Sequence, residues 1–169
     1  MGRKNRRRKI EYRDRLGFNP KKYIKQSAEK ADAVSYRKPE QTVRTPYRGE
    51  VWFAELGYHF GTSVQDGCRP VLIISNDTGN EHARTLVVLP ITSKKKKYDL
   101  PIHVGLNQKD LTKTDPDRPL GESMILAEQI TTIAKSSLRN YIGKVESADK
   151  LAEIDRAVKT QLGMALGYI

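Results

Sequence analysis

The chain has 169 residues, a net charge of +11, a single cysteine and 37% hydrophobic residues. That length suits one domain with an appended segment better than two domains, and the hydrophobic share is low for a chain that is packed throughout. One cysteine excludes an intrachain disulfide and a zinc site built from cysteines. The apolar runs 71–74 and 86–91 are far shorter than the roughly 20 residues of a membrane span, and no apolar segment follows the basic start as in a signal peptide. We therefore expect a cytoplasmic protein that does not enter a membrane.

The positive charge is concentrated at the N-terminus. Residues 1–46 hold 15 Lys/Arg and 5 Asp/Glu, a net charge of +10, whereas residues 47–169 carry a net charge of +1. Gly17 and Asn19-Pro20 interrupt the one helical pattern in this segment, and 34–46 has the composition of a linker. The sequence therefore predicts a basic, partly disordered or short-helical extension (1–46) before a domain (47–169). Such a charge attracts polyanions: added affinity for RNA or ribosomes is one interpretation, and a solvated extension or a DNA-binding role are the others.

The domain has the pattern of a β protein. Its strand segments are rich in β-branched and aromatic residues and are separated by polar or glycine-containing loops, with a turn at 76–82. The predicted strands are 50–56, 70–75, 85–92, 102–106, 123–133 and 140–145. Pro90 cannot donate to a sheet ladder, so we expect it at an edge, a bulge or the end of its strand.

A helix is predicted at the C-terminus, over residues 148–165. Ser147 can cap it, and its apolar residues fall on one face at three- and four-residue steps: Leu151, Ile154, Val158, Leu162 and Ala165. Short strands with long loops and one terminal helix predict a mostly β fold, a small barrel with the helix packed on it.

Five short motifs follow one another in this domain: RGEVW at 48–52, GCRPVLIISND at 67–77, PITS at 90–93, LPIHV at 100–104, and LAEQI with a following TI at 126–133. In this order and spacing they resemble the motifs of the MazF/PemK (Kid-like) family of type II toxin–antitoxin endoribonucleases, over about residues 47–165. The extension 1–46 lies outside the resemblance.

The resemblance implies a small Src-homology-3-like barrel of the PemK/CcdB type that is usually a homodimer. It implies a toxin that cuts single-stranded RNA at short sequences without a metal or other cofactor, leaving 2′,3′-cyclic phosphate and 5′-hydroxyl ends. It also implies a cognate antitoxin protein that blocks the RNA groove.

The resemblance assigns the cleavage to Arg69 and Thr92. A guanidinium matches a phosphate as a bidentate fork and stays charged, and a threonine hydroxyl can donate to a phosphoryl oxygen or orient the attacking 2′-hydroxyl. Ser93 is an alternative hydroxyl. Cys68, beside the arginine, is predicted to pack as a small apolar residue.

The loop before the arginine departs from the family, which often has an acid where this chain has Val64. Asp66 is a candidate replacement, because the loop seems one residue longer. His59 is a second candidate acid or base, because histidine titrates near neutrality. His82 and His103 are predicted to be structural, and three scattered histidines do not form a metal site.

Single-stranded RNA is read by side-chain amides and by stacking, and Tyr58 or Tyr98 could stack on a base. A run of four exposed lysines is equally compatible with a solvated loop, and Gln129 with support of a dimer. The candidates for the RNA groove are Asn76, Arg84, Lys94, Lys95, Lys96, Lys97 and Gln129.

Two other functions remain open. The altered loop before Arg69 is compatible with a binding module that keeps RNA or antitoxin binding with weakened catalysis. A gyrase poison of the CcdB type would share the barrel, but the RPVLI and ITS elements belong to the nuclease branch.

Overall fold

The structure is a computed structural model that describes residues 44–59, 61–94 and 100–164. The predictions for residues 1–43, for Lys95, Lys96 and Lys97 and for Tyr98 therefore lie outside the described residues. The strands of the described part are β1 (Glu50–Glu55), β2 (Cys68–Ile73), β3 (Thr85–Thr92), β4 (His103–Leu106), β5 (Ser123–Leu126), β6 (Thr131–Ala134) and β7 (Leu138–Lys144). The helices are α3 (Asp77–His82) and α4 (Ala148–Gln161), with single 3-10 turns η1 (Gln108–Asp110), η2 (Ala127–Gln129) and η3 (Lys135–Ser137).

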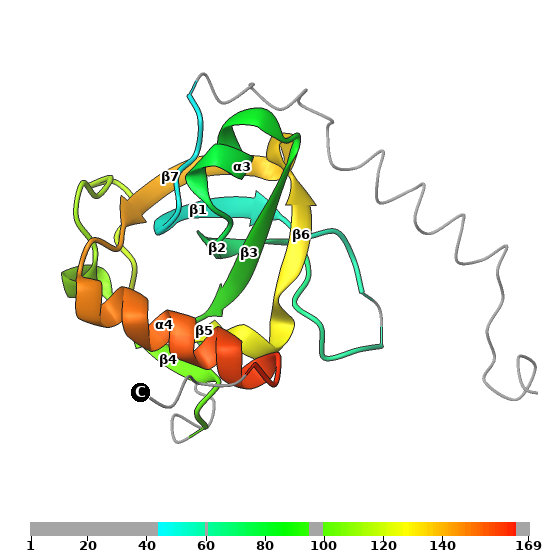
Figure 1. Cartoon of the computed structure of the whole chain (residues 1–169). Coiled ribbons are helices and arrows are strands. Elements are labelled where there is room, and N and C mark those ends of the chain that lie inside the picture. The colour runs from blue at the N-terminus through cyan, green and yellow to red at the C-terminus, as the bar shows by residue number, and fades with distance from the viewer. Residues whose placement is uncertain (1–43, 60, 95–99, 165–169) are drawn as a thin grey trace, which may run out of the picture. The chain divides into compact units, whose positions relative to one another are not determined.

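All strand pairs are antiparallel, and the sheet runs in the order β4-β5-β3-β2-β1-β7, with β6 pairing with β3 off this path. The β3 strand is shared between partners (Figure 1). Its first half, 85–88, pairs with β6; residues 88–90 pair with β2; and residues 91–92 pair with β5. Pro90 lies inside β3, in the last residue pair with β2, where the strand changes partner and a missing N–H is tolerated.

The prediction of a mostly β fold with a C-terminal helix is confirmed. The sheet is bent strongly enough to enclose a core, but within the described residues the ladder stays open, and β4 and β7 are the ends of its strand order. The helix predicted over 148–165 is confirmed over 148–161, with the Ser147 hydroxyl accepting a hydrogen bond from the Lys150 N–H at 3.3 Å. Leu162 does not belong to its packed face, because the side chain lies beyond the helix and is exposed.

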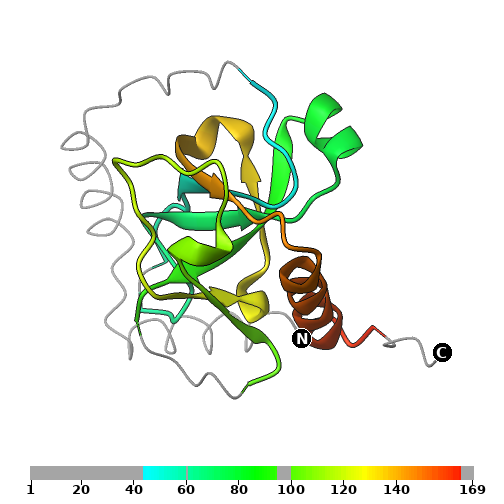
Figure 2. The ribbon, with the colours of Figure 1, turned by 90° about the vertical axis from the view of Figure 1, so that its left-hand side faces the viewer.

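Two apolar clusters lie on the two sides of the bent sheet. The inner cluster joins alternate residues of β1, β2 and β3, such as Val51, Leu72 and Leu89, to Ile154 and Ala157 of α4, and Figure 2 shows α4 lying along one side of the strands. The other cluster takes the intervening residues: Trp52, Ala54, Val71, Ile73, Leu86, Val88, Ile133 and Leu138. The central strands are therefore buried on both faces.

Two predicted segments were wrong. The single strand expected over 123–133 is broken by η2 into β5 and β6, because these two strands pair with different parts of β3. The turn expected over 76–82 contains the short helix α3. Asn76 caps it, its Oδ1 accepting the Gly79 N–H at 2.7 Å, and Asp77 adds a negative charge to the first turn.

Glu50, the acidic residue of the RGEVW motif, connects several segments at the start of the domain. The Glu50 carboxylate is 4% exposed and accepts hydrogen bonds from Arg44 Nη1 at 2.8 Å, Tyr47 N at 3.1 Å and Trp52 Nε1 at 2.9 Å. The Arg44 guanidinium lies over the Trp52 ring at 5.0 Å and the Tyr141 ring at 4.9 Å. Arg44 thus packs on the domain, although its sequence context was that of a linker.

The first two residues of the motif, Arg48 and Gly49, connect the start of β1 to α4 and to neighbouring backbone. Arg48 pairs with Asp155 of α4 and donates to the Ile74 carbonyl. Gly49 has a φ of +83°, and a Cβ at this position would lie 2.9 Å from the Val145 carbonyl oxygen. Its own carbonyl accepts the Val145 N–H at 2.9 Å. Only glycine fits this left-handed, closely approached backbone.

We predict that Gly49→Ala lowers the free energy of unfolding by at least about 2 kcal/mol, because it adds a left-handed alanine and a backbone clash. Gly121 is the matched control, since its φ lies outside the left-handed range and a Cβ there meets nothing within 4 Å. Urea unfolding of both variants measures the difference. Equal stabilities for Gly49→Ala and Gly121→Ala would contradict this account of the motif.

Candidate functional site

The two predicted catalytic residues lie on the same side of the sheet. The β2–β3 register ends at the pair of Val71 and Pro90. Arg69 lies two residues before Val71 in β2, and Thr92 lies two residues after Pro90 in β3. At that point β3 has turned to β5, and Thr92 pairs with Met124. Strand side chains alternate with a period of two. Both residues therefore lie on the side of the sheet that carries the second apolar cluster, which contains Val71 and Val88. They stand where its apolar residues end.

Each of the two side chains is held by a nearby group. Arg69, with its side chain 30% exposed, donates from Nε to the Asp66 carbonyl at 2.6 Å. Thr92 is 3% exposed, and its Oγ1 accepts the Lys94 N–H at 3.2 Å. A hydroxyl that accepts keeps its own proton to donate, and a guanidinium has five N–H donors. Both groups can therefore still donate to a bound anion.

Asp66 is the carboxylate that the structure pairs with Arg69: its Oδ1 lies 3.7 Å from Arg69 Nη2. Val64, which stands where the family often has an acid, is an exposed apolar side chain instead. The structure thus brings together two of the residues proposed from the sequence. Asp66 was proposed because the loop seems one residue longer than in the family, which moves the acid closer to the arginine in sequence.

The loop between β1 and β2 lies next to these residues. Its base is closed by Leu56 N donating to the Gly67 carbonyl at 3.0 Å and Gly67 N donating to the Gly57 carbonyl at 2.7 Å. Gln129 of η2 holds its far part: Gln129 Oε1 accepts the Gln65 N–H at 2.7 Å, and its Nε2 donates to the Ser63 carbonyl at 3.2 Å. Gln129, a candidate for RNA contact or dimer support, is therefore bound to this loop.

The remaining loop candidates are accessible from solvent. His59 is exposed, and its carbonyl accepts the Thr62 hydroxyl at 2.9 Å. Tyr58 is 53% exposed. Ser93 and Lys94 are exposed directly after Thr92. These residues keep their predicted access to a polyanion on the loop side of the site.

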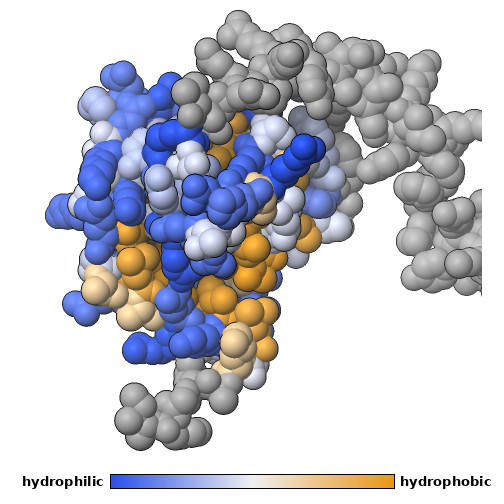
Figure 3. All heavy atoms as spheres, turned by 45° about the horizontal axis from the view of Figure 1, so that its top comes forward, coloured by the Kyte–Doolittle hydropathy of each residue, from blue (hydrophilic) through white to orange (hydrophobic). Residues whose placement is uncertain are grey.

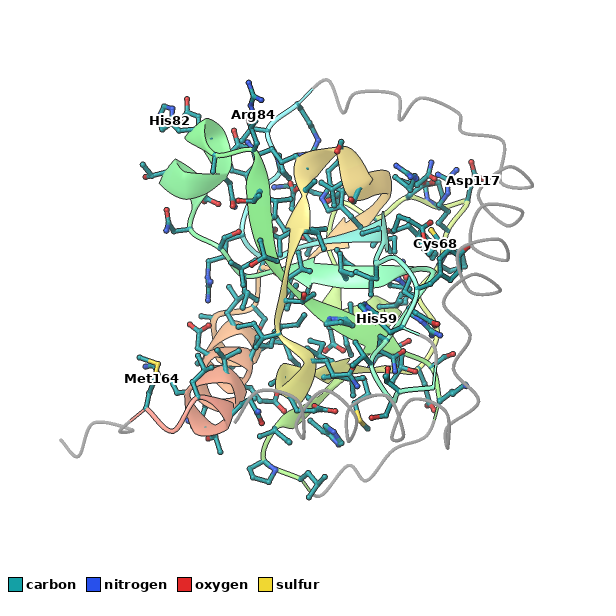
Figure 4. The ribbon with its side chains drawn as sticks, turned by 90° about the vertical axis from the view of Figure 1, so that its right-hand side faces the viewer. His59, Cys68, His82, Arg84, Asp117 and Met164 are labelled. Carbon is teal, nitrogen blue, oxygen red and sulfur yellow. The ribbon has the colours of Figure 1, made fainter. Side chains whose placement is uncertain are left out.

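Two candidates for the RNA groove lie elsewhere. Asn76 uses its side chain to cap α3, and the exposed Arg84 follows that helix. In Figure 4, Arg84 and His82 lie at the α3 end of the domain, well separated from His59 and Cys68. Among the described candidates, Arg84 therefore lies apart from His59 of the β1–β2 loop.

The three histidines have different surroundings. His103 has a side chain that is 5% exposed and lies 3.2 Å from Glu128, from its Nε2 to Oε1, as expected of a structural residue. His82 is 74% exposed and lies on α3 beside Glu81, so the structural role predicted for it is wrong. Within residues 44–59, 61–94 and 100–164, no three His, Cys, Asp or Glu side chains gather as a metal site.

Cys68 does not pack as a small apolar residue, because it is exposed at the first position of β2. Partial burial raises the pKa of its thiol, and the Glu55 carboxylate across the β1–β2 pair raises it further, while Arg139 opposes them. The strand begins two residues earlier than predicted, which moves Cys68 from the loop into the sheet edge. Figure 3 shows one face of the molecule. Hydrophilic side chains cover most of this face, and apolar side chains gather toward the lower part of the view.

Together, the bent antiparallel sheet and the terminal helix define a small, mostly β domain, in which Arg69 lies beside Asp66 of the β1–β2 loop. A family model for the PemK-like, MazF-like toxin of type II toxin-antitoxin systems matches residues 47–162. The chain belongs to this family, and the resemblance inferred from its motifs is confirmed.

Solved structures agree with this assignment. An endoribonuclease from Mycobacterial species is 25% identical, with a TM-score of 0.54, over 75% of this chain and 99% of that one. An endoribonuclease in complex with its cognate antitoxin, also from Mycobacterial species, is 29% identical, with a TM-score of 0.54, over 73% and 99%. MazF from Deinococcus radiodurans, 23% identical over 72% and 99% with a TM-score of 0.57, shares the fold. No helix among the described residues is long and apolar enough to cross a membrane.

We predict that Cys68 reacts with iodoacetamide more slowly at pH 7.5 in the folded protein than in urea, because its raised pKa leaves less thiolate. Glu55→Gln removes a charge that opposes the thiolate and should speed the reaction, whereas Arg139→Gln should slow it. The measurement is the alkylation rate against pH, followed by mass spectrometry. A folded rate equal to the unfolded rate at every pH would contradict the raised pKa.

Proposed function

We propose that this chain is the toxin of a type II toxin–antitoxin system and acts as a metal-independent endoribonuclease on single-stranded RNA. The 2′-hydroxyl would attack the adjacent phosphorus and leave 2′,3′-cyclic phosphate and 5′-hydroxyl ends. The observation that supports this most is the placement of Arg69 and Thr92 on one side of the sheet, below the loop that carries Asp66. Family membership and two endoribonucleases at 25% and 29% identity support the same reading.

The chemistry follows from the charges that develop. The bond from the 2′-oxygen to phosphorus forms, the bond from phosphorus to the 5′-oxygen breaks, and negative charge grows on the phosphoryl oxygens. Arg69 offers a charged planar fork to those oxygens. Thr92, which is 3% exposed and held by the Lys94 N–H, would offer one oriented hydroxyl donor.

A proton must leave the 2′-hydroxyl and another must reach the 5′-oxygen. The Asp66 carboxylate stands beside Arg69 and is the group we assign to proton transfer at the 2′ side. His59, on the same loop, is the alternative for either transfer. Ser93 lies directly after Thr92, the last residue of β3, and is the alternative hydroxyl.

The partners follow the family. We propose that RNA approaches along the loop side of the site, past Lys94 and the exposed Tyr58, and that the chain forms a homodimer. One similar structure is an endoribonuclease in complex with its cognate antitoxin, and a cognate antitoxin protein is the regulator we propose here. The excess charge of residues 1–46 would raise the affinity for RNA in a salt-dependent way.

One alternative has an observation in its favour. Val64 stands where the family often has an acid, and the guanidinium of Arg69 is already engaged by Asp66. A domain that binds RNA or antitoxin with weakened catalysis would be compatible with both facts. Cleavage assays separate it from the nuclease.

We predict that the purified chain cuts a long single-stranded RNA at discrete positions in EDTA and leaves cyclic-phosphate ends. Arg69→Ala should abolish cutting, and Thr92→Ala should slow it about 10²–10³-fold, the usual effect of losing one donor to a developing charge. Arg156→Ala is the matched arginine control, because Arg156 is exposed on α4 and has no part in the proposed site, and its rate should stay within a few-fold of the wild type.

End-group analysis and gel electrophoresis give the readout. A wild-type chain that binds this RNA without cutting any site would exclude the nuclease and leave the binding module. Equal losses in Arg69→Ala and Arg156→Ala would show that bulk charge, rather than the strand-end site, carries the activity.

A further inference from the structure

Gln129 links two parts of the chain that lie 64 residues apart. It is the last residue of η2, between β5 and β6, and its amide makes two hydrogen bonds to the backbone of the β1–β2 loop. The oxygen accepts from Gln65 N at 2.7 Å, and the nitrogen donates to the Ser63 carbonyl at 3.2 Å. One side chain therefore pairs with a donor and an acceptor two residues apart, as the edge of a neighbouring strand would.

The loop needs such a tie. The described loop residues, 57–59 and 61–67, contain no helix or strand, and Gly57, Gly61 and Gly67 have positive φ values of 79°, 71° and 68°. Residues 61–64 are exposed. A long loop with flexible glycines and few buried contacts opens at low free-energy cost. Hydrogen bonds from a side chain fixed on the sheet restrict that motion.

The loop residues that Gln129 binds lie shortly before Arg69, the proposed catalytic arginine, in the chain. Gln65, whose N–H is bound by Gln129, is followed by Asp66. The Asp66 carbonyl accepts Arg69 Nε at 2.6 Å, and its carboxylate lies 3.7 Å from Arg69 Nη2. The contacts thus run without a gap from Gln129 through Gln65 and Asp66 to the guanidinium.

We propose that Gln129 is a positioning residue for the RNA-cleavage site. By fixing Ser63 and Gln65, it fixes Asp66, and Asp66 in turn orients the Arg69 guanidinium toward the scissile phosphate. Gln129 itself does not touch the reacting atoms. This proposal rests on the function proposed above, because it gives Arg69 a phosphate to bind.

The expected effect is on rate more than on binding. A displacement of about 1 Å in a group that stabilises the transition state can cost roughly 10²-fold in rate. We therefore expect Gln129→Ala to lower the single-turnover cleavage rate about 10–100-fold. Affinity for RNA should fall only a few-fold, since phosphate contacts away from Arg69 persist.

Two further variants sharpen the test. Gln129→Glu keeps an oxygen that accepts from Gln65 N but loses the donor to Ser63, so its effect should be intermediate. Gln108→Ala is the matched control: Gln108 Oε1 accepts the Leu120 N–H at 2.7 Å, a comparable amide-to-backbone bond to a different loop. It should leave the cleavage rate and the β1–β2 loop unchanged.

The closing experiment is a double-mutant cycle on RNA binding in the full chain. The probe is a single-stranded RNA with a 2′-deoxy sugar at the cut position, so that no cleavage occurs. Affinities are measured for the wild type, Gln129→Ala, Arg69→Ala and the double variant. Hydrogen exchange of residues 57–67 is followed in the same proteins.

If Gln129 acts through Arg69, Gln129→Ala weakens binding when Arg69 is present and adds nothing in the Arg69→Ala background. The loop amides, Gln65 above all, should then exchange faster in Gln129→Ala but not in Gln108→Ala, and Gln129→Glu, which keeps the acceptor for Gln65 N, should lie between these two. Additive effects on binding, or an unchanged loop in Gln129→Ala, would overturn the proposal. Should Gln129→Ala fail to fold, the same cycle is run with Gln129→Glu.

Failure of the proposed function has a different result. A wild type that binds the RNA probe but cuts no natural RNA would exclude the nuclease, and the cycle would still decide whether Gln129 positions Arg69. A wild type that binds no RNA would exclude both.

Discussion

Burial on both sides of β2 and β3 is the constraint on which the rest of the domain depends. Leu72 and Leu89 face the cluster that includes α4, while Val71 and Val88 face the other cluster. Because strand side chains alternate, a slip of one residue would exchange the two faces and bury the wrong set. The register is therefore fixed by the apolar residues. It is this register that sends Arg69 and Thr92 to the same side.

The motifs of the family divide into residues that build the domain and residues that serve the site. Arg48, Gly49 and Glu50 belong to the first group: an ion pair to α4, a left-handed backbone and a buried carboxylate with three donors. We assign Arg69 and Thr92 to the second group as part of the proposed function. Gln129 has features of both groups. It makes structural hydrogen bonds to the backbone of the β1–β2 loop, and that loop lies beside Arg69.

Much of this could be predicted from local patterns. The bounds of β3, 85–92, were predicted correctly from a run of apolar β-branched residues, and α4 from its apolar spacing and serine cap. Asp66 was named as a replacement for the family's acid from the extra residue in its loop, and it lies beside Arg69. The family itself could be inferred, because five motifs carry information that no single element does.

The errors have a common physical origin in contacts between distant segments. The break between β5 and β6 follows the change of partner along β3, which the apolar run 123–133 does not reveal. The role of Gln129 depends on a loop 64 residues away. β2 begins beside the site, at Cys68 and Arg69, but Asn76 and Arg84 come after its far end. They lie at the α3 end of the domain, away from Cys68 and His59.

The central claim is that one end of a double-faced sheet presents Arg69 and Thr92 to the same phosphate. A crystal structure of the chain with a short single-stranded RNA that has a 2′-deoxy sugar at the cut position tests it most directly. The account predicts a phosphate in contact with the Arg69 guanidinium, with the Thr92 hydroxyl donating to the same group and the β1–β2 loop held by Gln129. RNA bound instead at the α3 end, with no phosphate at Arg69, would contradict it.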